Sequence, residues 1–427
     1  MLHFLKKLIP QSVKNVFYHL PVAVCAAFWY GFPGRRLMVV GVTGTDGKTT
    51  TAHMLTHILE RSGKKVSLAS TIAFRSGGES QVNATKYTTL SAFFVQKFLR
   101  DAVRSGVTYV VLEVSSHALD QYRLWGVPFV VGAITNVTRE HLDYHQTMGA
   151  YRRSKRRLLE RSLCVVVNGG MENPQEFWTA TMHGSEKSVY GFSDEKDFSD
   201  AAIRAIASSV VLDLSGSRFV VSGVDFRLSL LGRFNIENAL CSVSCARFLG
   251  VSFEESAQAL SSFAPLPGRM EFVPNDRGLS IVVDYAVTPH SLVLLYDLLH
   301  DLRRGAGRVI AVFGACGDRD RGKRPEMGRV VSERADVVVL TDEDPYFENP
   351  KRILNDIAKG ITGRREMVDF FRIMDRREAI AKALLLARTG DIVVVTGKGA
   401  EETMAVRDDR LPWNDRQVIE EELKKLN

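Results

Sequence analysis

Residues 41–51 read GVTGTDGKTTT, and this stretch sets the expected fold. An apolar run of strand length, LMVV at 37–40, precedes it, and AHMLTHIL at 52–59 follows with apolar residues at helical spacing. The order strand, glycine-rich turn, helix is typical of a phosphate-binding loop, in which backbone N–H groups and a helix N-terminus hold anionic oxygens. We expect Lys48 to reach the outer phosphates and the Thr49 hydroxyl to bind Mg²⁺.

The stretch departs from the general phosphate-loop pattern at one position. That pattern has a glycine six residues before the lysine, where this chain has Val42, and the glycines present are Gly41, Gly44 and Gly47. The alternative is a glycine-rich turn that binds nothing. A Gly-Lys-Thr-Thr run at a strand-to-helix junction is hard to explain by packing alone, so the sequence favours phosphate binding.

Length and composition fit a globular protein of two or three domains with 427 residues and a net charge of +7. Basic clusters at 152–157 (RRSKRR) and 319–324 (RDRGKR) suit small anionic substrates or nucleic acid equally. No basic run is interleaved with aromatic residues and no nucleic-acid-binding motif occurs, so we expect no nucleic-acid partner. The five scattered cysteines indicate a reducing compartment, and we expect a cytoplasmic protein.

The N-terminal segment is apolar. Residues 16–32 read VFYHLPVAVCAAFWYGF and follow Lys6, Lys7 and Lys14, as in a signal peptide. His19 interrupts the run, which is short for a membrane span, and cleavage would send the phosphate site outside the cell. We therefore expect a helical segment that packs on the first domain of a monomer. Peripheral membrane contact, or docking of a second copy, is the alternative.

Strand-like and helix-like segments alternate from residue 37 to about 250, which predicts an α/β fold with a parallel sheet covered by helices. Three β-like runs within 209–231 predict a small antiparallel appendage. Leu266-Pro267-Gly268 is the expected boundary, after which the alternation restarts. The later strands are expected at 279–285, 309–314, 336–341 and 391–396.

Polar residues follow several expected strands. Glu113 closes the run YVVLEV, where a carboxylate could bind Mg²⁺ or only cap the next helix. Asn136 ends the next strand and opens a polar stretch containing His141, Asp143, His145 and Lys155. Asn235 and Asn238 share one helical face and could read a base edge or cap the helix.

These segments, together with EVSSHAL at 113–119, PGRME at 267–271 and DRDRGKRPEMG at 318–328, resemble the Mur ligase superfamily. Within it they are most similar to the UDP-N-acetylmuramoyl-tripeptide synthetases. The resemblance implies three parts: an apolar helical segment (1–36), a phosphate-loop ATPase domain with a parallel sheet (37–266), and a smaller Rossmann-like α/β domain (267–427). Here about three dozen residues precede the phosphate loop, too few for the family's usual UDP-binding first domain.

The resemblance also implies a reaction. ATP phosphorylates the carboxylate of a UDP-muramoyl peptide, and the amine of an amino acid attacks the acyl phosphate to form an amide in peptidoglycan synthesis. Lys48, Lys155, His141 and Glu113 would be catalytic, and two Mg²⁺ ions would be held by Thr49, Glu113, His141 and a carbamylated Lys155. Lys323, Arg324 and Pro325 match a segment that closes over the site. Nucleotide-binding residues would be Gly44, Thr45, Gly47, Lys48, Thr49, Thr50, Asn136, Asn235, Asn238, Arg269 and Asp284. Acceptor and amino-acid contacts would come from Thr88, Thr89, Ser115, Arg123, Asp344, Lys398 and Glu401.

Several positions depart from the family pattern, and they belong to the acceptor half. Val287 and Ala400 stand where the family often has histidines, and Leu90 replaces a proline. The Asp-Asn-Pro-Arg motif of diaminopimelate-adding members aligns with 343–346, so that Tyr346 replaces the arginine. Two other readings therefore stay open: a ligase like folylpolyglutamate or cyanophycin synthetase acting on another carboxylate, or a non-catalytic ATP-binding partner subunit.

Overall fold

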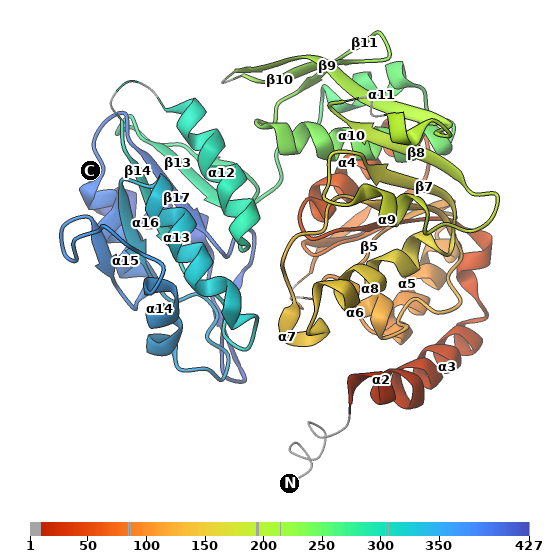
Figure 1. Cartoon of the computed structure of the whole chain (residues 1–427), viewed down its shortest axis with the longest axis horizontal. Helices are drawn as coiled ribbons and strands as arrows, with labels where there is room; N and C mark the ends of the chain where they lie inside the picture. Colours follow the sequence, from red (N-terminus) through yellow and green to blue (C-terminus); the bar gives the residue numbers. More distant parts are fainter. Residues whose placement is uncertain are drawn as a thin grey trace.

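The computed structural model describes residues 10–426 except 84, 86, 194, 195, 214, 304 and 306. Two sheets, each between helical layers, lie side by side (Figure 1). The chain builds the sheet on the right of this view first and crosses once to the sheet on the left. This arrangement agrees with the predicted α/β class and with a second, smaller α/β unit.

Within the described residues the larger sheet has 11 strands, and β1 lies near its middle. In spatial order the strands are β11 (Val224–Leu228), β10 (Gly216–Val221), β9 (Ile203–Asp213), β8 (Glu186–Gly191), β7 (Ser162–Asn168), β6 (Phe129–Ile134), β1 (Met38–Thr43), β5 (Tyr109–Glu113), β2 (Val66–Ala69), β3 (Ala73–Ser76) and β4 (Glu79–Val82). Adjacent strands from β9 to β2 are parallel. The phosphate loop thus leaves a central strand at the carboxyl edge, where parallel sheets bind ligands.

Helices cover both faces of this sheet because its central strands are apolar on both sides. One face carries α4 (Lys48–Arg61), α10 (Arg233–Phe248) and α11 (Phe253–Leu260). The other carries α5 (Ala92–Arg104), α6 (Ser116–Asp120), α8 (Met148–Leu159) and α9 (Pro174–Trp178). The short α7 (Leu142–His145) and η3 (Lys196–Phe198) lie in connections. Val40 packs towards the first layer and Val39 towards the second.

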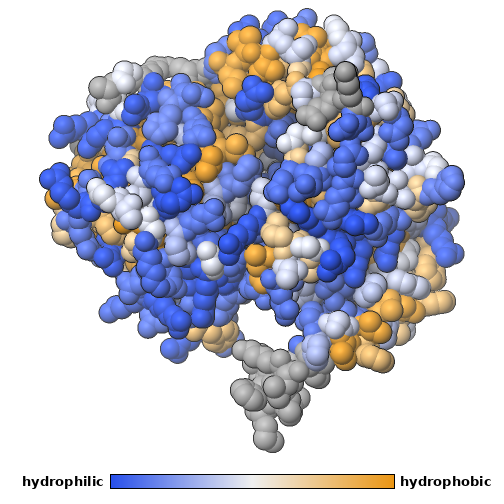
Figure 2. Space-filling model, viewed as in Figure 1, coloured by the Kyte–Doolittle hydropathy of each residue, from blue (hydrophilic) through white to orange (hydrophobic). Residues whose placement is uncertain are grey.

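The N-terminal segment is helical, as expected, and packs on the second of these layers. It comprises α2 (Gln11–Lys14), a π-helical turn η1 (Asn15–His19), α3 (Leu20–Tyr30) and η2 (Pro33–Arg36). Ala23 and Ala26 of α3 pack against Ala92 of α5. No helix in the described part of the chain is both long and apolar enough to cross a membrane. Figure 2 shows hydrophobic side chains gathered over this segment at the lower right.

The smaller sheet follows the crossing. Its spatial order is β12 (Glu271–Val273), β13 (Ser280–Asp284), β17 (Ile392–Thr396), β14 (Val309–Phe313), β15 (Val337–Leu340) and β16 (Phe370–Arg372). One face carries α12 (Pro289–Leu302), α13 (Arg324–Arg334) and α14 (Pro350–Ala358), and the other α15 (Arg376–Leu386) and α16 (Asp415–Leu426). The turn η4 (Arg321–Lys323) leads into α13, and β18 (Thr403–Val406) pairs with β19 (Asp409–Pro412).

The structure corrects the prediction for residues 209–231. These strands are antiparallel to one another, as expected, but they are not a separate appendage. The first of them, β9, begins at Ile203 and bonds in parallel to β8, so that the three strands extend the main sheet. β8 is not among the strands predicted from the sequence, because its first two residues are charged and only its later residues are buried.

Candidate active site between the two sheets

The phosphate loop joins β1 to α4 and is held by the neighbouring strand. Asn136, just after β6, accepts from the backbone N–H of Asp46 at 2.9 Å and of Thr45 at 2.9 Å. Gly47 caps α4 with φ = 82°, and a Cβ there would lie 2.3 Å from Asn238 Oδ1, so only glycine fits. The Lys48 ammonium lies over the loop, 2.8 Å from the Thr45 carbonyl oxygen. The loop is therefore preformed with its amides around the helix N-terminus.

Thr49 and Glu113 form the centre of the predicted Mg²⁺ site. The Thr49 hydroxyl lies 3.0 and 3.1 Å from the two Glu113 carboxylate oxygens. Thr71 donates to the same carboxylate through its backbone N–H at 2.8 Å and its hydroxyl at 2.9 Å. A hydroxyl beside a buried carboxylate at a strand end suits a hard divalent cation. Such a cation would take the place of the hydrogen bond between Thr49 and Glu113.

His141 and Lys155 form a second group on the other side of the loop. His141 Nδ1 is buried and has no hydrogen-bond partner among the described residues, and its ring lies 4.8 Å from that of His117. Burial lowers the pKa of His141 well below 6.5, so its imidazole is neutral and able to bind a metal. Lys155 is completely buried and donates to the Gly44 carbonyl oxygen. Burial likewise lowers the pKa of Lys155 well below 10.5.

These donors fit Mg²⁺ only in part. In the described portion of the chain, no three His, Cys, Asp or Glu side chains gather closely enough to hold a metal by themselves. Mg²⁺ normally takes one or two protein carboxylates and completes its shell with phosphate oxygens and water. The Thr49–Glu113 pair and the orphaned His141 nitrogen are consistent with two ions that depend on bound phosphate.

The predicted nucleotide residues of α10 lie against the phosphate loop. Asn235 Nδ2 donates to the Leu231 carbonyl at 2.8 Å, near the start of α10. Asn238 accepts from the Thr51 hydroxyl at 3.3 Å and donates to Asn235 at 3.3 Å. Both side chains also line the cavity described below. Asn238 thus links α10 to α4, and Asn235 supports Asn238 at the cavity wall.

The acceptor residues predicted from the resemblance border Glu113. The Thr89 hydroxyl donates to the Glu113 carbonyl at 2.9 Å and accepts from the Ser115 amide at 3.0 Å. Arg123 donates to the Thr89 carbonyl at 2.7 Å, and the Thr88 hydroxyl accepts from Thr71 at 3.0 Å. The chain therefore brings these four residues together beside the Mg²⁺ candidate.

Residues of the smaller sheet form the opposite wall, and it is acidic. The Cys316 thiol donates to Glu343 Oε1 at 3.0 Å, while Glu343 Oε2 is buried without a hydrogen-bond partner in the described residues. Lys398 is completely buried behind this wall and pairs with Asp344 at 2.9 Å and with Glu401. Tyr346 has the Arg319 and Arg410 guanidinium groups 5.9 and 5.6 Å from its ring centroid.

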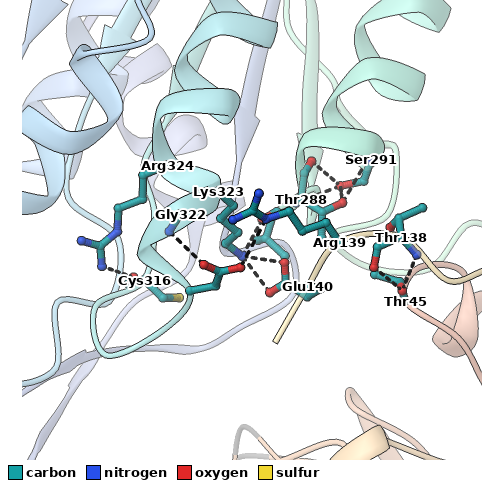
Figure 3. Close-up of polar contacts among 12 residues, drawn as sticks. Thr45, Thr138, Arg139, Glu140, Thr288, Ser291, Cys316, Gly322, Lys323 and Arg324 are labelled. Carbon is teal, nitrogen blue, oxygen red and sulfur yellow. Dashed lines mark hydrogen bonds and ion pairs between the residues drawn. The ribbon is translucent and has the colours of Figure 1, made fainter. Parts of the chain in front are cut away.

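A buried ion pair joins the two walls across the site (Figure 3). Lys323, just before α13, lies 2.8 and 3.1 Å from the carboxylate oxygens of Glu140, which follows β6. It also donates to the Val287 carbonyl at 2.9 Å. Burial opposes the charge on Lys323, but the Glu140 carboxylate outweighs this and raises the pKa of the lysine. Thr288 adds a 3.3 Å hydrogen bond to Asp46 of the phosphate loop.

The backbone that crosses between the sheets, at Gly268, packs against the loop at residues 399–400. Gly268 has φ = 62°, and a Cβ there would lie 2.0 Å from the Ala400 nitrogen. A Cβ on Gly399 would in turn lie 2.8 Å from the Gly268 carbonyl oxygen. Arg269, next to the crossing, reaches Thr49 at 3.4 Å and stacks its guanidinium 4.3 Å from the Tyr285 ring centroid. Asp284 accepts from the Met270 and Ala286 amides at 2.8 Å.

Together these walls enclose a cavity of about 640 Å³. Most residues predicted for the site line it; Gly44, Lys155 and Lys398 lie just behind its surface. Sequence reasoning missed Thr71, Glu140 and Cys316. Glu140 had a signal, because it precedes His141 in a polar stretch, but its partner Lys323 is 183 positions away.

Comparison with known proteins shows which family models this chain matches. Residues 42–246 match the Mur ligase middle domain, and residues 268–399 match the domain described as Mur ligase, glutamate ligase domain.

Two curated relatives match nearly the whole chain. UDP-N-acetylmuramoyl-L-alanyl-D-glutamate–2,6-diaminopimelate ligase of Clostridium tetani is 36% identical over 414 residues, covering 95% of this chain and 81% of the relative. UDP-N-acetylmuramyl-tripeptide synthetase of a Roseiflexus species is 37% identical over 415 residues, covering 92% and 80%. A solved structure of a UDP-N-acetylmuramoyl-L-alanyl-D-glutamate–2,6-diaminopimelate ligase is 30% identical, with a TM-score of 0.60, over 91% of this chain and 79% of that one.

The chain spans about four-fifths of these relatives, and both of its sheets fall within the matched regions. The protein therefore belongs to the Mur ligase family.

Proposed function

We propose that this protein uses ATP to join an amino acid to the carboxyl group of a UDP-N-acetylmuramoyl peptide, as an ATP-dependent amide ligase of peptidoglycan synthesis in the cytoplasm. The carrying observation is the cavity of about 640 Å³ that unites the phosphate loop, the Glu113 carboxylate and an acidic wall from the second sheet. Bound ATP and the amine of the incoming amino acid would both face this cavity. All five cysteines lie in the described part of the chain and are free, which suits a reducing compartment.

At the phosphate end, Lys48 and the loop amides would neutralise the charge of the transferred phosphoryl group. Thr49 and Glu113 would hold one Mg²⁺, and His141 a second. Such ions supply electrostatic stabilisation of phosphate oxygens in the transition state. Thr88, Thr89, Ser115 and Arg123 lie beside Glu113 and would position the acceptor carboxylate for attack on the terminal phosphate, which yields an acyl phosphate and ADP.

We further propose that Lys155 is carbamylated by CO₂. The neutral amine attacks the carbon of CO₂, and loss of one proton leaves a carbamate anion. Complete burial favours the neutral amine that this reaction needs. The modification would turn a buried neutral amine beside the phosphate loop into an anionic ligand.

At the opposite wall, Glu343, Asp344 and Glu401 would receive the ammonium group of the incoming amino acid. The unpaired Glu343 Oε2 is the strongest support, because a buried acceptor without a donor is costly unless a ligand supplies one. A neutral amine must form before attack on the acyl phosphate, and these carboxylates could take its proton. Tyr346 would set which side chain is accepted.

A phosphate-release assay tests this proposal. The protein is mixed with ATP, Mg²⁺, UDP-N-acetylmuramoyl dipeptide and single amino acids, and the product mass is measured. Release that needs all components, with a product heavier by one aminoacyl residue, is expected. ATP binding without release under any pairing would favour the non-catalytic subunit, a reading motivated by Val287 and Ala400. Release with folate and glutamate instead would favour the folylpolyglutamate-type reading.

A further inference from the structure

The helical segment at residues 11–30 exposes its largest apolar side chains. Phe17 and Trp29 are each 78% exposed, more than any other large apolar residue described. Tyr18 and Phe28 are also well exposed, at 64% and 66%. We call these four residues the aromatic face. Figure 2 shows a hydrophobic area over this segment at the lower right.

The segment places its large and small apolar residues in the opposite way to an ordinary amphipathic helix. A helix that only braces a protein turns its large apolar side chains inward. Here the inward residues of α3 are Ala23, Ala26 and Ala27, which are completely buried and let the helix lie close to α5. The segment is thus anchored by its small residues and presents its large ones outward, which indicates a further contact.

The charges of the N-terminal residues indicate which kind of surface this segment would contact. The first acidic residue of the chain is Asp46, so the preceding positions carry cations without any carboxylate. These cations are Lys6, Lys7, Lys14, Arg35 and Arg36. Arg35 and Arg36 are exposed directly after α3, and Arg35 lies 4.5 Å from the Phe32 ring centroid. Aromatic residues combined with cations are typical of helices that lie in the interface of an anionic bilayer.

A second copy of the chain fits this surface less well. A symmetric dimer would place the same patch on itself and bring like charges together. One short helical segment also supplies less area than the roughly 1,200–2,000 Å² of a stable interface. Spanning does not fit the packing of the segment, because the small residues of α3 are buried against α5 of the first domain.

A relay of hydrogen bonds links the segment to Arg123 in the wall of the cavity. Asn15 donates to Asp120 Oδ2 at 2.6 Å, and Tyr144 donates to the same oxygen at 3.0 Å. Gln121 donates to Tyr144 at 3.2 Å and accepts from Arg123, which lines the cavity beside Thr89. Any external surface that binds the segment would therefore lie near the acceptor end of the site.

We propose that this segment docks on an anionic lipid bilayer. Phe17, Phe28 and Trp29 enter the headgroup region, and Arg35 and Arg36 pair with lipid phosphates. The docking itself does not depend on the proposed reaction; only its consequence, an acceptor end held beside the membrane, rests on it.

Vesicle flotation of the full chain tests the docking. The protein is mixed with vesicles of phosphatidylcholine alone or of phosphatidylcholine with phosphatidylglycerol, at low and high salt. We expect binding to the anionic vesicles that weakens with salt. The F17S/F28S/W29S variant should lose at least tenfold in vesicle affinity, and R35Q/R36Q about fivefold per arginine. Because these side chains are exposed, all variants should keep the parent's circular dichroism and melting temperature.

Matched controls change similar residues elsewhere. Leu163 and Leu385 are exposed apolar side chains outside the segment, and Lys65 and Arg227 are exposed cations. The L163S/L385S and K65Q/R227Q variants should bind vesicles as the parent does.

Three results would overturn the docking proposal. They are no binding to anionic vesicles, equal binding by parent and F17S/F28S/W29S, and a parent dimer in light scattering that the triple variant converts to monomer. The last result would assign the aromatic face to a second copy of the chain. Vesicle binding without phosphate release would leave the docking intact and count against the proposed function alone.

Discussion

The two ends of the cavity are built in different ways. The phosphate end comes from one continuous stretch, β1 to α4, with Asn136 and Glu113 from the two strands that flank β1. The amino-acid end comes from loops of the smaller sheet, where Cys316, Glu343 and Glu401 meet from three separate stretches. The first end therefore follows from local sequence and backbone geometry. The second end depends on side chains from separate loops, and Tyr346, one of the positions predicted to differ from the family pattern, lies there.

The largest expected effect is at the phosphate end. Lys48→Ala should lower ATP turnover about a hundredfold to a thousandfold, because it removes a positive charge aimed at the transferred phosphate. Lys48 is only partly buried, so the melting temperature should not fall. Phosphate release and calorimetry measure the two quantities. Lys65→Ala, at the exposed side of the same domain, is the control, and unchanged turnover in Lys48→Ala would contradict the assignment.

Lys155→Ala should also cost about a hundredfold in turnover, because it removes the anionic carbamate that would hold a metal ion at the phosphate end. If the lysine carries a carbamate, added formate or acetate should restore part of the activity by replacing the lost oxygens. The parent enzyme with the same acids is the control and should not gain. A fully active alanine variant would rule out a role for this residue.

Acid should weaken the buried ion pair between Arg324 and Glu348 in the part of the chain that forms the smaller sheet. Hydrogen bonds from Arg324 lower the pKa of Glu348 from 4.5 to about 2. A carboxyl group with a lowered folded pKa stabilises the fold above its unfolded pKa, and that stabilisation is lost as the pH falls from 4.5 towards 2. Glu348→Gln should therefore cost about 3 kcal/mol at neutral pH and flatten the acid unfolding curve in that window. Denaturant titrations at several pH values measure both, and an unchanged acid slope would be inconsistent with the pair.

The smallest effect concerns the choice of amino acid. Tyr346 replaces an arginine that would bind a carboxylate in two places, and such a contact contributes roughly 1.5–3 kcal/mol. We expect kcat/KM for lysine to exceed that for meso-diaminopimelate by about tenfold or more. Arg319 and Arg410 flank the Tyr346 ring and could offset part of the loss. A clear preference for diaminopimelate that disappears in Arg410→Gln would show that they do.

The sequence predicted the parts of this molecule that are continuous in the chain. The glycine pattern and the apolar runs placed β1, α4 and Glu113 at one sheet edge. The features that the sequence did not predict depend on contacts between distant segments. Residue spacing gave no sign that Lys323 pairs with Glu140, and β8 was missed because an edge-like polar start hides a strand whose second half is buried. The exposure of Phe17 and Trp29 also required the structure, since an apolar helix can turn either face inward.

The contact between Gly268 and the 399–400 backbone has a consequence for mutational tolerance. At this point two main chains touch with no side chain between them, so a methyl group at either glycine would force the crossing and the loop apart. The loop carries Glu401 into the cavity, and the crossing carries Arg269 to Thr49. Substitution at Gly268 would thus disturb both substrates' sites at once, and no single change at Gly399 could restore them. Both positions should therefore require glycine.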